Sequence, residues 1–348
     1  MAVGDSALIS GLSYVALGRE VTFGTAVTAT ALLPVLSSSL TLKKENKILE
    51  QVERSRTYSQ RTPQMVKVDG DMSFYFQPKL LACNWLLQNA FVGTVTSATA
   101  TSETVGGTAM THTFNVGDIY QSYPSLSITQ RKGPASGGKP FNYLGCRVNE
   151  IMFSAEMNDA LKCNVGLLGA NATAGSDVHT TTMQTVSSAL SFVNGRLSVE
   201  GSLGALTTTS FWHVQSIEFG WSNNLKGDAA AGRIGSEAIG VLPAGMCTFT
   251  FRAKMRFDTT TAWDAMKAST KLAAQLEFLG ETMTGSVARE GLRINLPVVY
   301  VHAAGEPTIG GPNEMLTSDV EFHVLRQDDT TAGYAMQALL TNNIQSFA

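Results

Sequence analysis

The stretch closest to a cofactor motif is Gly133-Pro-Ala-Ser-Gly-Gly-Lys139, which fits the spacing G-x-x-x-x-G-K. A phosphate-binding loop of this type needs a Ser or Thr after the lysine to hold magnesium, and a helix whose first turn faces the phosphates. Here Pro140 follows, and the next residues read as a strand. The stretch is therefore interpreted as a flexible loop between two strands, and no cofactor site is predicted.

The histidines and cysteines lack the spacing of metal ligands. No two histidines form an HxxxH pair, and no two cysteines form a C-x-x-C pair. Zinc sites combine such ligands at short spacings, so no metal site is predicted and the thiols are interpreted as buried and reduced. His213 and His323 alternate with apolar positions and are expected on the outer face of a sheet. The residues concerned are His112, His179, His213, His302, His323, Cys83, Cys146, Cys163 and Cys247.

The sequence predicts no catalytic residue and no enzyme. There is no G-x-S-x-G nucleophile motif, and the adjacent carboxylates Asp328 and Asp329 are expected in a solvated turn. Acid–base chemistry would need a partner group in a pocket, which the sequence does not supply. The four tryptophans are favoured as core residues, with stacking platforms for a ligand as the alternative. They are Trp85, Trp212, Trp221 and Trp263.

The composition favours a structural assembly. The chain has 348 residues, which favours two domains, and is 44% hydrophobic but only 15% charged. Average chains are about a quarter charged, and a surface so poor in charge is easier to explain if neighbouring copies cover it. The net charge of −3 gives no support for binding nucleic acid through its phosphates. The sequence shows neither a signal peptide nor a membrane-spanning segment.

Strand patterns dominate, and the predicted fold class is mostly β. Residues 248–257 alternate strictly, with Phe249 and Phe251 on the apolar face and Arg252 on the other. Residues 71–77, 214–221, 292–301 and 319–325 show the same period of two. Only two helices are predicted, over 78–91 and 260–275.

The order of predicted elements is repeated along the chain. Each helix directly follows a strand, ending at Phe76 in the first half and at Phe257 in the second. Before each of these strands the pattern is a strand followed by a long loop, which matches residues 33–42 with 213–221. After each helix, the pattern matches the last strands, 148–157 with 318–327 and 160–170 with 331–340. The sequence therefore predicts two tandem domains, 1–175 and 176–348, each a β-sandwich or barrel with one flanking helix and one long loop. A hairpin at 190–201, with Asn194-Gly195 as its turn, is predicted to open the second domain.

The two long loops, 43–67 and 222–242, lie at equivalent places. The first holds seven basic and three acidic residues, and the second is rich in glycine and alanine. Loops of this length inside compact domains are usually functional or mobile. They are interpreted either as solvated excursions or, in the favoured reading, as arms that order against a neighbouring subunit. The charged residues predicted to make those contacts are Lys43, Lys44, Glu45, Lys47, Glu50, Glu53, Arg54, Arg56, Arg61, Lys226, Asp228, Arg233 and Glu237.

The N-terminal segment GREVTFGTAVTATALLPVLSSSL resembles the opening of one family of tail tube proteins (major tail proteins) of long-tailed bacteriophages, G-x-E-x-T-F-G-T-x-V-x-P-T-x-F-L-P-V-x-S-x-S-L. Ala29 and Leu32 stand where that pattern has Pro and Phe. The matching residues are Gly18, Glu20, Thr22, Phe23, Gly24, Thr25, Val27, Thr30, Leu33, Pro34, Val35, Ser37, Ser39 and Leu40.

This resemblance implies a virion tail protein, assembled in the host bacterial cytoplasm, that forms stacked rings around a tape-measure protein. It also implies contacts with tail terminator and distal tail proteins, and later passage of double-stranded DNA through the lumen without sequence-specific binding. Tube rings commonly have six domains, so two domains per chain imply a homotrimer with pseudo-sixfold symmetry. Six chains per ring would follow if one half were a decoration.

The polar residues Arg252, Lys254 and Arg256 are candidates for the lumen or for an interface. A strongly basic lumen would retain DNA, which favours pairing of these residues with acidic groups across an interface. The runner-up function is a receptor- or carbohydrate-binding β-sandwich of a tail tip or baseplate, which would need an exposed cluster of aromatic and carboxylate side chains.

Overall fold

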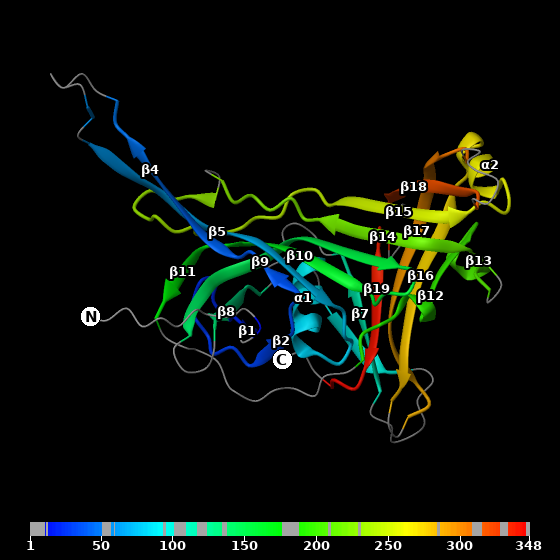
Figure 1. Cartoon of the computed structure of the whole chain (residues 1–348), viewed down its shortest axis with the longest axis horizontal. Helices are drawn as coiled ribbons and strands as arrows, with labels where there is room; N and C mark the ends of the chain where they lie inside the picture. The colour runs from blue at the N-terminus through cyan, green and yellow to red at the C-terminus, as the bar shows by residue number, and fades with distance from the viewer. Residues whose placement is uncertain are drawn as a thin grey trace.

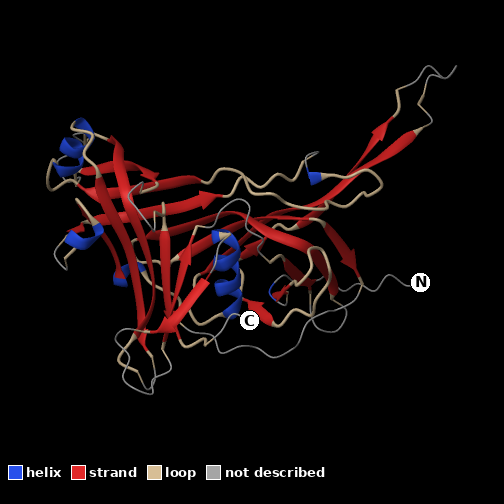
Figure 2. Cartoon of the chain, turned by 180° about the vertical axis from the view of Figure 1, so that it is seen from behind, coloured by secondary structure: helices blue, strands red, loops and turns tan. Residues whose placement is uncertain are grey.

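The computed structural model describes residues 11, 13–50, 57–58, 60–92, 95–100, 109–116, 124–133, 138–175, 188–207, 210–228, 231–283, 286–307, 315–327 and 333–345. In that part of the chain the fold is mostly β, as predicted, with two α-helices and antiparallel strand pairing throughout the sheets (Figures 1 and 2). We refer to residues 14–174 as the first repeat and to residues 195–342 as the second repeat.

The elements of the first repeat are β1 (Tyr14–Arg19), β2 (Ala31–Leu33), β3 (Ser37–Ser38), β4 (Thr41–Ile48), β5 (Arg61–Tyr75), α1 (Leu81–Phe91), β6 (Val95–Thr99), β7 (Met110–Asn115), β8 (Leu126–Lys132), β9 (Lys139–Glu156), β10 (Lys162–Gly169) and β11 (Asn171–Ala174). Those of the second repeat are β12 (Gly195–Glu200), β13 (Phe211–Trp212), β14 (Val214–Ser222), β15 (Thr248–Arg256), α2 (Thr261–Lys267), β16 (Leu272–Thr282), β17 (Arg289–Ala304), β18 (Thr317–Leu325) and β19 (Gln337–Asn342). Two short 3₁₀ turns, Phe192–Asn194 and Leu203–Ala205, flank β12.

In the first repeat one long strand belongs to two layers. The N-terminal part of β9 lies in the order β2–β1–β8–β9–β11. Its C-terminal part continues into the order β4–β5–β10–β9, with the short β3 also paired to β5. The apolar faces of both layers and of α1 contribute to one hydrophobic core. A strand that passes through both layers fixes them relative to each other.

The second repeat has the same pairing pattern. The order β13–β12–β16–β17–β19 matches the first layer, and β14–β15–β18–β17 matches the second. Some irregularities also recur, because β9 shifts register against β8 and β10, and β17 shifts at the equivalent places against β16 and β18. A further shift between β16 and β17, at Leu279/Thr282, has no counterpart in the first repeat. Bulges of this kind re-aim a strand, so their recurrence means that both long strands bend at equivalent places.

Two strands of the first repeat have no counterpart in the second. β6 and β7 form a hairpin, and β7 pairs with β19 of the second repeat. His112 of β7 is buried in this pairing, where Nε2 contacts the Asn342 Oδ1 at 3.0 Å and burial lowers the pKa of the imidazole.

The predicted matching of the last strands is wrong by one strand, because β9 corresponds to β17 and β10 to β18. The domain boundary at 175/176 stays a prediction.

Four local predictions also differ from the structure. The second helix ends at Lys267 rather than near 275, because Ser269 is left-handed (φ 51°) and β16 then pairs with β17. Residues 190–201 form no hairpin, since β12 pairs with β16. The expected strand over 33–42 is divided into β2, β3 and β4. Much of the expected loop 43–67 is the paired arm of β4 and β5.

The segment that carries the family resemblance is organised by one buried carboxylate. Glu20 is 2% exposed, and its Oε1 accepts bonds from the Gly145 amide at 2.9 Å and the Ser127 hydroxyl at 2.8 Å. Its Oε2 accepts the Gly24 amide at 2.8 Å and the Ser125 hydroxyl. Gly24 is left-handed (φ 72°), a conformation that glycine adopts without strain. Glu20 thus ties the turn after β1 to β8 and β9.

Replacing Glu20 by glutamine is expected to lower the free energy of unfolding by about 2–3 kcal/mol. The NH₂ group of glutamine must replace one of the two oxygens. In one orientation of the side-chain amide it faces the Gly24 N–H, and in the other it faces the Gly145 N–H, so one donor always faces another donor. Chemical unfolding of the unassembled protein measures the change. The matched control is Glu156→Gln, at an exposed carboxylate, which should change stability by less than about 0.5 kcal/mol. Equal effects of the two variants would contradict this role.

Candidate functional site

The two repeats join through one continuous sheet. β9 pairs with β14 from Glu156↔Ser216 to Glu150↔Ser222, which gives the order β4–β5–β10–β9–β14–β15–β18–β17 across the whole chain. Phe153 and Phe219 face each other in this register and both are buried. Because side chains alternate along a strand, one register places the aromatic faces of both repeats on the same side of the sheet.

Hydrogen bonds from Trp221 and Asn223 to the first repeat stabilise the pairing of β9 with β14. Trp221 is 2% exposed, and its indole N–H donates to the Ala90 carbonyl at 2.9 Å, at the C-terminal end of α1. The Asn223 amide donates to the same carbonyl at 2.9 Å and to the Val148 carbonyl at 3.0 Å. The Phe91 ring packs against the indole with centroids 4.8 Å apart. The Ala90 carbonyl, which lies in the last turn of α1 where carbonyls lack a partner within the helix, thereby connects the second repeat to the first.

The opposite face of this sheet is polar and carries both signs of charge. Arg252 lies between Glu321, at 3.2 Å, and Glu218, at 4.0 Å, on neighbouring strands. Arg256 forms a 2.6 Å ion pair with Asp258, and Lys254 is exposed opposite Asp319. Both arginines therefore pair with carboxylates of their own chain, whereas the prediction was for pairing with acidic groups across an interface. Their placement in a lumen or an interface stays a prediction.

The strands β4 and β5 extend beyond the body of the protein as a two-stranded arm (Figure 1). Lys47, Glu50 and Arg61 are exposed on the arm. Lys43 forms an ion pair with Asp69 of β5. Glu45 lies in β4, whereas Glu53, Arg54 and Arg56 lie outside the described residues. The arm presents a row of charges, and none of the predicted contacts to another subunit is tested by one chain.

The second predicted loop packs against the arm of the same chain (Figure 1). The Val66 amide donates to the Glu237 carbonyl at 2.7 Å, and the Glu237 carboxylate forms an ion pair with Lys44. Ile239 and Leu242 are buried in a small cluster beside β5 and β10. Lys226, Asp228 and Arg233 remain exposed. The two long loops therefore lie side by side, a contact that the sequence did not predict.

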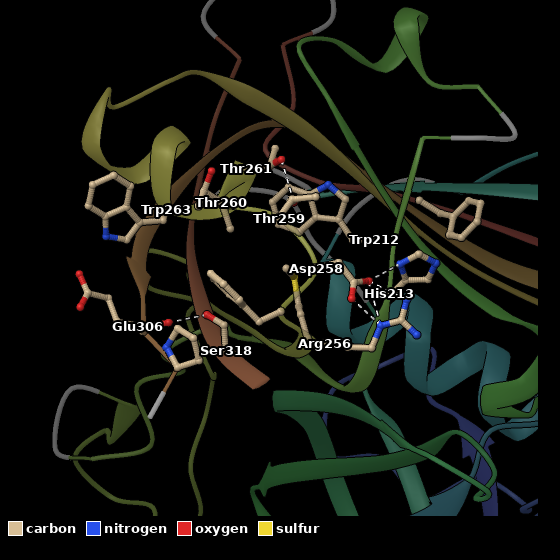
Figure 3. Close-up of a pocket in the computed structure, with 16 residues that line it drawn as sticks. Trp212, His213, Arg256, Asp258, Thr259, Thr260, Thr261, Trp263, Glu306 and Ser318 are labelled. Atoms are coloured by element: carbon tan, nitrogen blue, oxygen red, sulfur yellow. Dashed lines mark hydrogen bonds and ion pairs between the residues drawn. The ribbon is translucent and has the colours of Figure 1, made fainter. Parts of the chain in front are cut away.

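An open cavity of about 630 Å³ lies in the second repeat between β13, the end of β15 and the start of α2 (Figure 3). Trp212, Phe257 and Trp263 supply aromatic walls. At one side Asp258 is held by Arg256 and by His213, whose Nδ1 lies 3.0 Å away, and the bond from Arg256 lowers the pKa of the carboxyl. The cavity thus combines aromatic groups with a charged rim.

Cofactor and metal chemistry find no support in the described part of the chain. No three His, Cys, Asp or Glu side chains converge there to hold a metal ion. Gly133 follows β8 and Lys139 begins β9, so the glycine-rich stretch connects two paired strands as predicted. The four cysteines are free, and burial raises the pKa of Cys83 and Cys247 to about 12. His302 and His323 stack on the exposed face at 3.9 Å.

The free edges of the long sheet are the remaining candidate surface. Residues 36–43 pair with β5 on one side, and they occupy the place that β14 occupies in the second repeat. At the other end, Ala303 and Ala304 of β17 correspond to Glu150 and Ile151 of β9, which pair with β14. Each chain therefore contains one completed β9–β14 pairing and, in residues 36–43 and at the end of β17, counterparts of its two strands.

The family model for phage tail tube proteins matches residues 11–324. The chain belongs to the phage tail tube protein family. A search of curated proteins found no match. The chain is therefore a structural subunit of a phage tail tube, a component of the virion tail. No described helix has the length and apolar character needed to cross a membrane.

In this tail tube protein the pairing of β9 with β14 is the site that connects the two repeats. It can be tested at Gly220, where an added Cβ would lie 2.3 Å from the Ile151 carbonyl oxygen and 2.8 Å from the Met152 sulfur. Gly220→Ala is expected to lower the free energy of unfolding by about 1–3 kcal/mol through overpacking. Denaturant unfolding of the unassembled protein measures it.

The matched control is Gly201→Ala, where the added methyl group meets nothing within 4 Å. It is expected to leave stability within about 0.5 kcal/mol of the parent. A Gly220→Ala protein as stable as the control would mean that β9 and β14 are not held at this separation.

Proposed function

We propose that three copies of this chain form each ring of the tube, so that six repeats surround the axis. The observation that carries the proposal is the repeated strand pairing, with one join made inside the chain by β9 and β14. The equivalent edges, residues 36–43 and those following His302, are placed to make the same join between copies. An interface of unlike surfaces closes into a ring if the rotation permits, and closure removes every exposed edge of the sheet.

The polar face of the continuous sheet is proposed to line the lumen. It carries the guanidinium of Arg252 between the carboxylates of Glu218 and Glu321, so both signs of charge lie side by side. A surface with both signs of charge would not retain the phosphate backbone of double-stranded DNA, which a basic surface would bind. The same lumen would hold a tape-measure protein during assembly, before genome ejection. The tail terminator and distal tail proteins are proposed to cap the two ends.

Ring symmetry is the direct measurement. Reconstruction of purified tubes by electron cryomicroscopy is expected to show three identical chains per ring, with alternating first and second repeats. Six chains per ring would overturn the trimer. Discrete particles at all protein concentrations, instead of hollow filaments of uniform width, would overturn the tube assembly itself.

The β4–β5 arm is proposed to stack successive rings. Its charged side chains lie away from the hydrophobic core, as expected for a surface that pairs with another subunit. Loops in such positions are usually functional. The residues proposed for this contact are those predicted from the sequence, namely Lys43, Lys44, Glu45, Lys47, Glu50, Glu53, Arg54, Arg56, Arg61, Lys226, Asp228, Arg233 and Glu237.

Replacing residues 49–60 by Asn-Gly is expected to keep the fold and the rings but prevent their stacking. Ile48 and Arg61 face each other across the arm, so a two-residue turn can connect β4 to β5. Sedimentation and electron microscopy separate single rings from tubes. Deletion of residues 102–107, between β6 and the strand that follows it, is the length control and should still give tubes. Tubes of normal length from the shortened arm would show that other surfaces stack the rings.

A second candidate function has one observation in its favour. The cavity beside α2 carries the aromatic and carboxylate groups, including Trp263, Asp258 and Glu306, that a carbohydrate-binding site needs (Figure 3). Glycan-dependent binding by a discrete oligomer would support this function in a tail tip or baseplate.

A further inference from the structure

The cavity in the second repeat corresponds to a place that is filled in the first. In the first repeat the Phe76 amide donates to the Leu161 carbonyl at 2.9 Å, where β5 ends and β10 begins. In the second repeat the Phe257 amide donates to the Leu316 carbonyl at 3.0 Å, where β15 ends and β18 begins. The matching pairing patterns make these two pairs equivalent.

In the first repeat Leu190 is inserted beside this pair. Its amide donates to the Phe76 carbonyl at 3.1 Å, and its carbonyl accepts the Leu161 amide at 2.7 Å. The Phe192 amide continues the contact at the Asp159 carbonyl, 3.1 Å away. Leu190 is 1% exposed and Leu161 is fully buried. A short segment that precedes β12 therefore completes the core of the first repeat.

The equivalent place in the second repeat has no such segment among the described residues. Leu316 is 39% exposed and the neighbouring Met315 is 64% exposed, in contrast to buried Leu161. In the described part of the chain, neither the Leu316 amide nor the Phe257 carbonyl is found in a hydrogen bond. Phe257 also borders the 630 Å³ cavity. The second repeat thus presents the Phe257 carbonyl, the Leu316 amide and an apolar space. In the first repeat the equivalent groups bind Leu190.

The sequence contains a second copy of the segment that fills the first repeat. Ser188-Ala189-Leu190 stands before β12, and Ser6-Ala7-Leu8 stands before β1. Both leucines precede by seven residues the first buried strand residue, Leu197 or Val15.

The strand registers show independently that Val15 and Leu197 are equivalent. Val15 pairs with Gln130 of β8, and Leu197 pairs with Leu276 of β16. These partners occupy matching positions relative to the shared bulges of β8–β9 and β16–β17. Leu8 therefore stands at the same distance in sequence from Val15 as Leu190 does from the equivalent residue Leu197.

We propose that residues Ser6–Ser10 of a neighbouring copy bind beside Phe257 and Leu316 of the second repeat. Within the chain, the segment before one repeat fills the preceding repeat. In a ring of alternating repeats, the first repeat of the next copy follows the second repeat, so its leading segment reaches this site. The inference rests on the proposed ring and names the segment that holds neighbouring copies together in it.

The expected contacts follow the internal example. The Leu8 amide donates to the Phe257 carbonyl, its carbonyl accepts the Leu316 amide, and its side chain enters the apolar part of the cavity near Trp212. Burial of a leucine and of the exposed Met315 and Leu316 side chains drives the binding. The strand-like addition supplies backbone hydrogen bonds, as in other cases where a segment adds to a sheet edge.

Crosslinking between copies tests the proposal. One full-length preparation carries Leu8→Cys and another carries Leu316→Cys, and the two are mixed, assembled and oxidised with copper phenanthroline. A disulfide-linked dimer is expected only in the mixture. Val241→Cys replaces Leu316→Cys in the control, because Val241 is also exposed but lies on the loop beside the arm, and it should give no dimer with Leu8→Cys.

Assembly provides a second readout. Leu8→Asp is expected to raise the protein concentration needed for tube formation by about tenfold or more, because it places a charge where an apolar side chain is buried. Val3→Asp makes a similar change outside the Ser6–Ser10 segment and should assemble like the parent. The stability of the unassembled protein should be the same for both variants.

The outcomes separate this inference from the proposed function. Threefold rings without the disulfide-linked dimer, and with normal assembly of Leu8→Asp, would overturn the inference and leave the ring intact. Absence of threefold rings in the parent would overturn the proposed function first. Tubes that bind a glycan at this cavity while Leu8 is crosslinked to nothing would identify a carbohydrate as the occupant and also overturn the inference.

Discussion

The backbone ladder between β9 and β14 is the constraint on which the rest of the molecule depends. Strand edges expose donors and acceptors that require partners, and here the edge of one repeat is paired by the edge of the next. The register also determines both faces of the sheet. Phe153 opposite Phe219 sends the aromatic groups to the core, and Ser154 opposite Glu218 leaves polar groups on the other face. A shift by one residue would exchange the two faces.

Local patterns in the sequence were sufficient for the main strands and for both helices. The alternation at 248–257 gave a strand that the structure places at Thr248–Arg256, and both helices begin within three residues of the predicted start. Their extent was less predictable. Residues 43–67 look like a polar loop because the arm has little core to face, yet their backbone groups pair with each other along β4 and β5.

Long-range partners explain what the sequence could not supply. The role of Glu20 depends on Ser125, Ser127 and Gly145, which are more than 100 residues away. The mismatch of the last strands has the same origin, because the β6–β7 hairpin has no counterpart in the second repeat and its partner is β19. The contact of the second loop with Lys44 and Val66 likewise follows from tertiary packing. Periodicity identifies which face of a strand is buried, but not which strand lies beside it.

Duplication changes the problem of building a ring. If six separate domains formed it, every join would have to form by association, each with a loss of translational and rotational freedom. In the proposed trimer half of the joins form during folding, since the linker makes the contact intramolecular. The two kinds of join can then differ in strength. The internal one places Trp221 against the Ala90 carbonyl, whereas the equivalent residue of the first repeat is Leu42, which is 39% exposed and has no indole to donate. A strong internal join beside a weaker external one favours folded single chains in solution and leaves ring closure to the cooperative contacts of assembly.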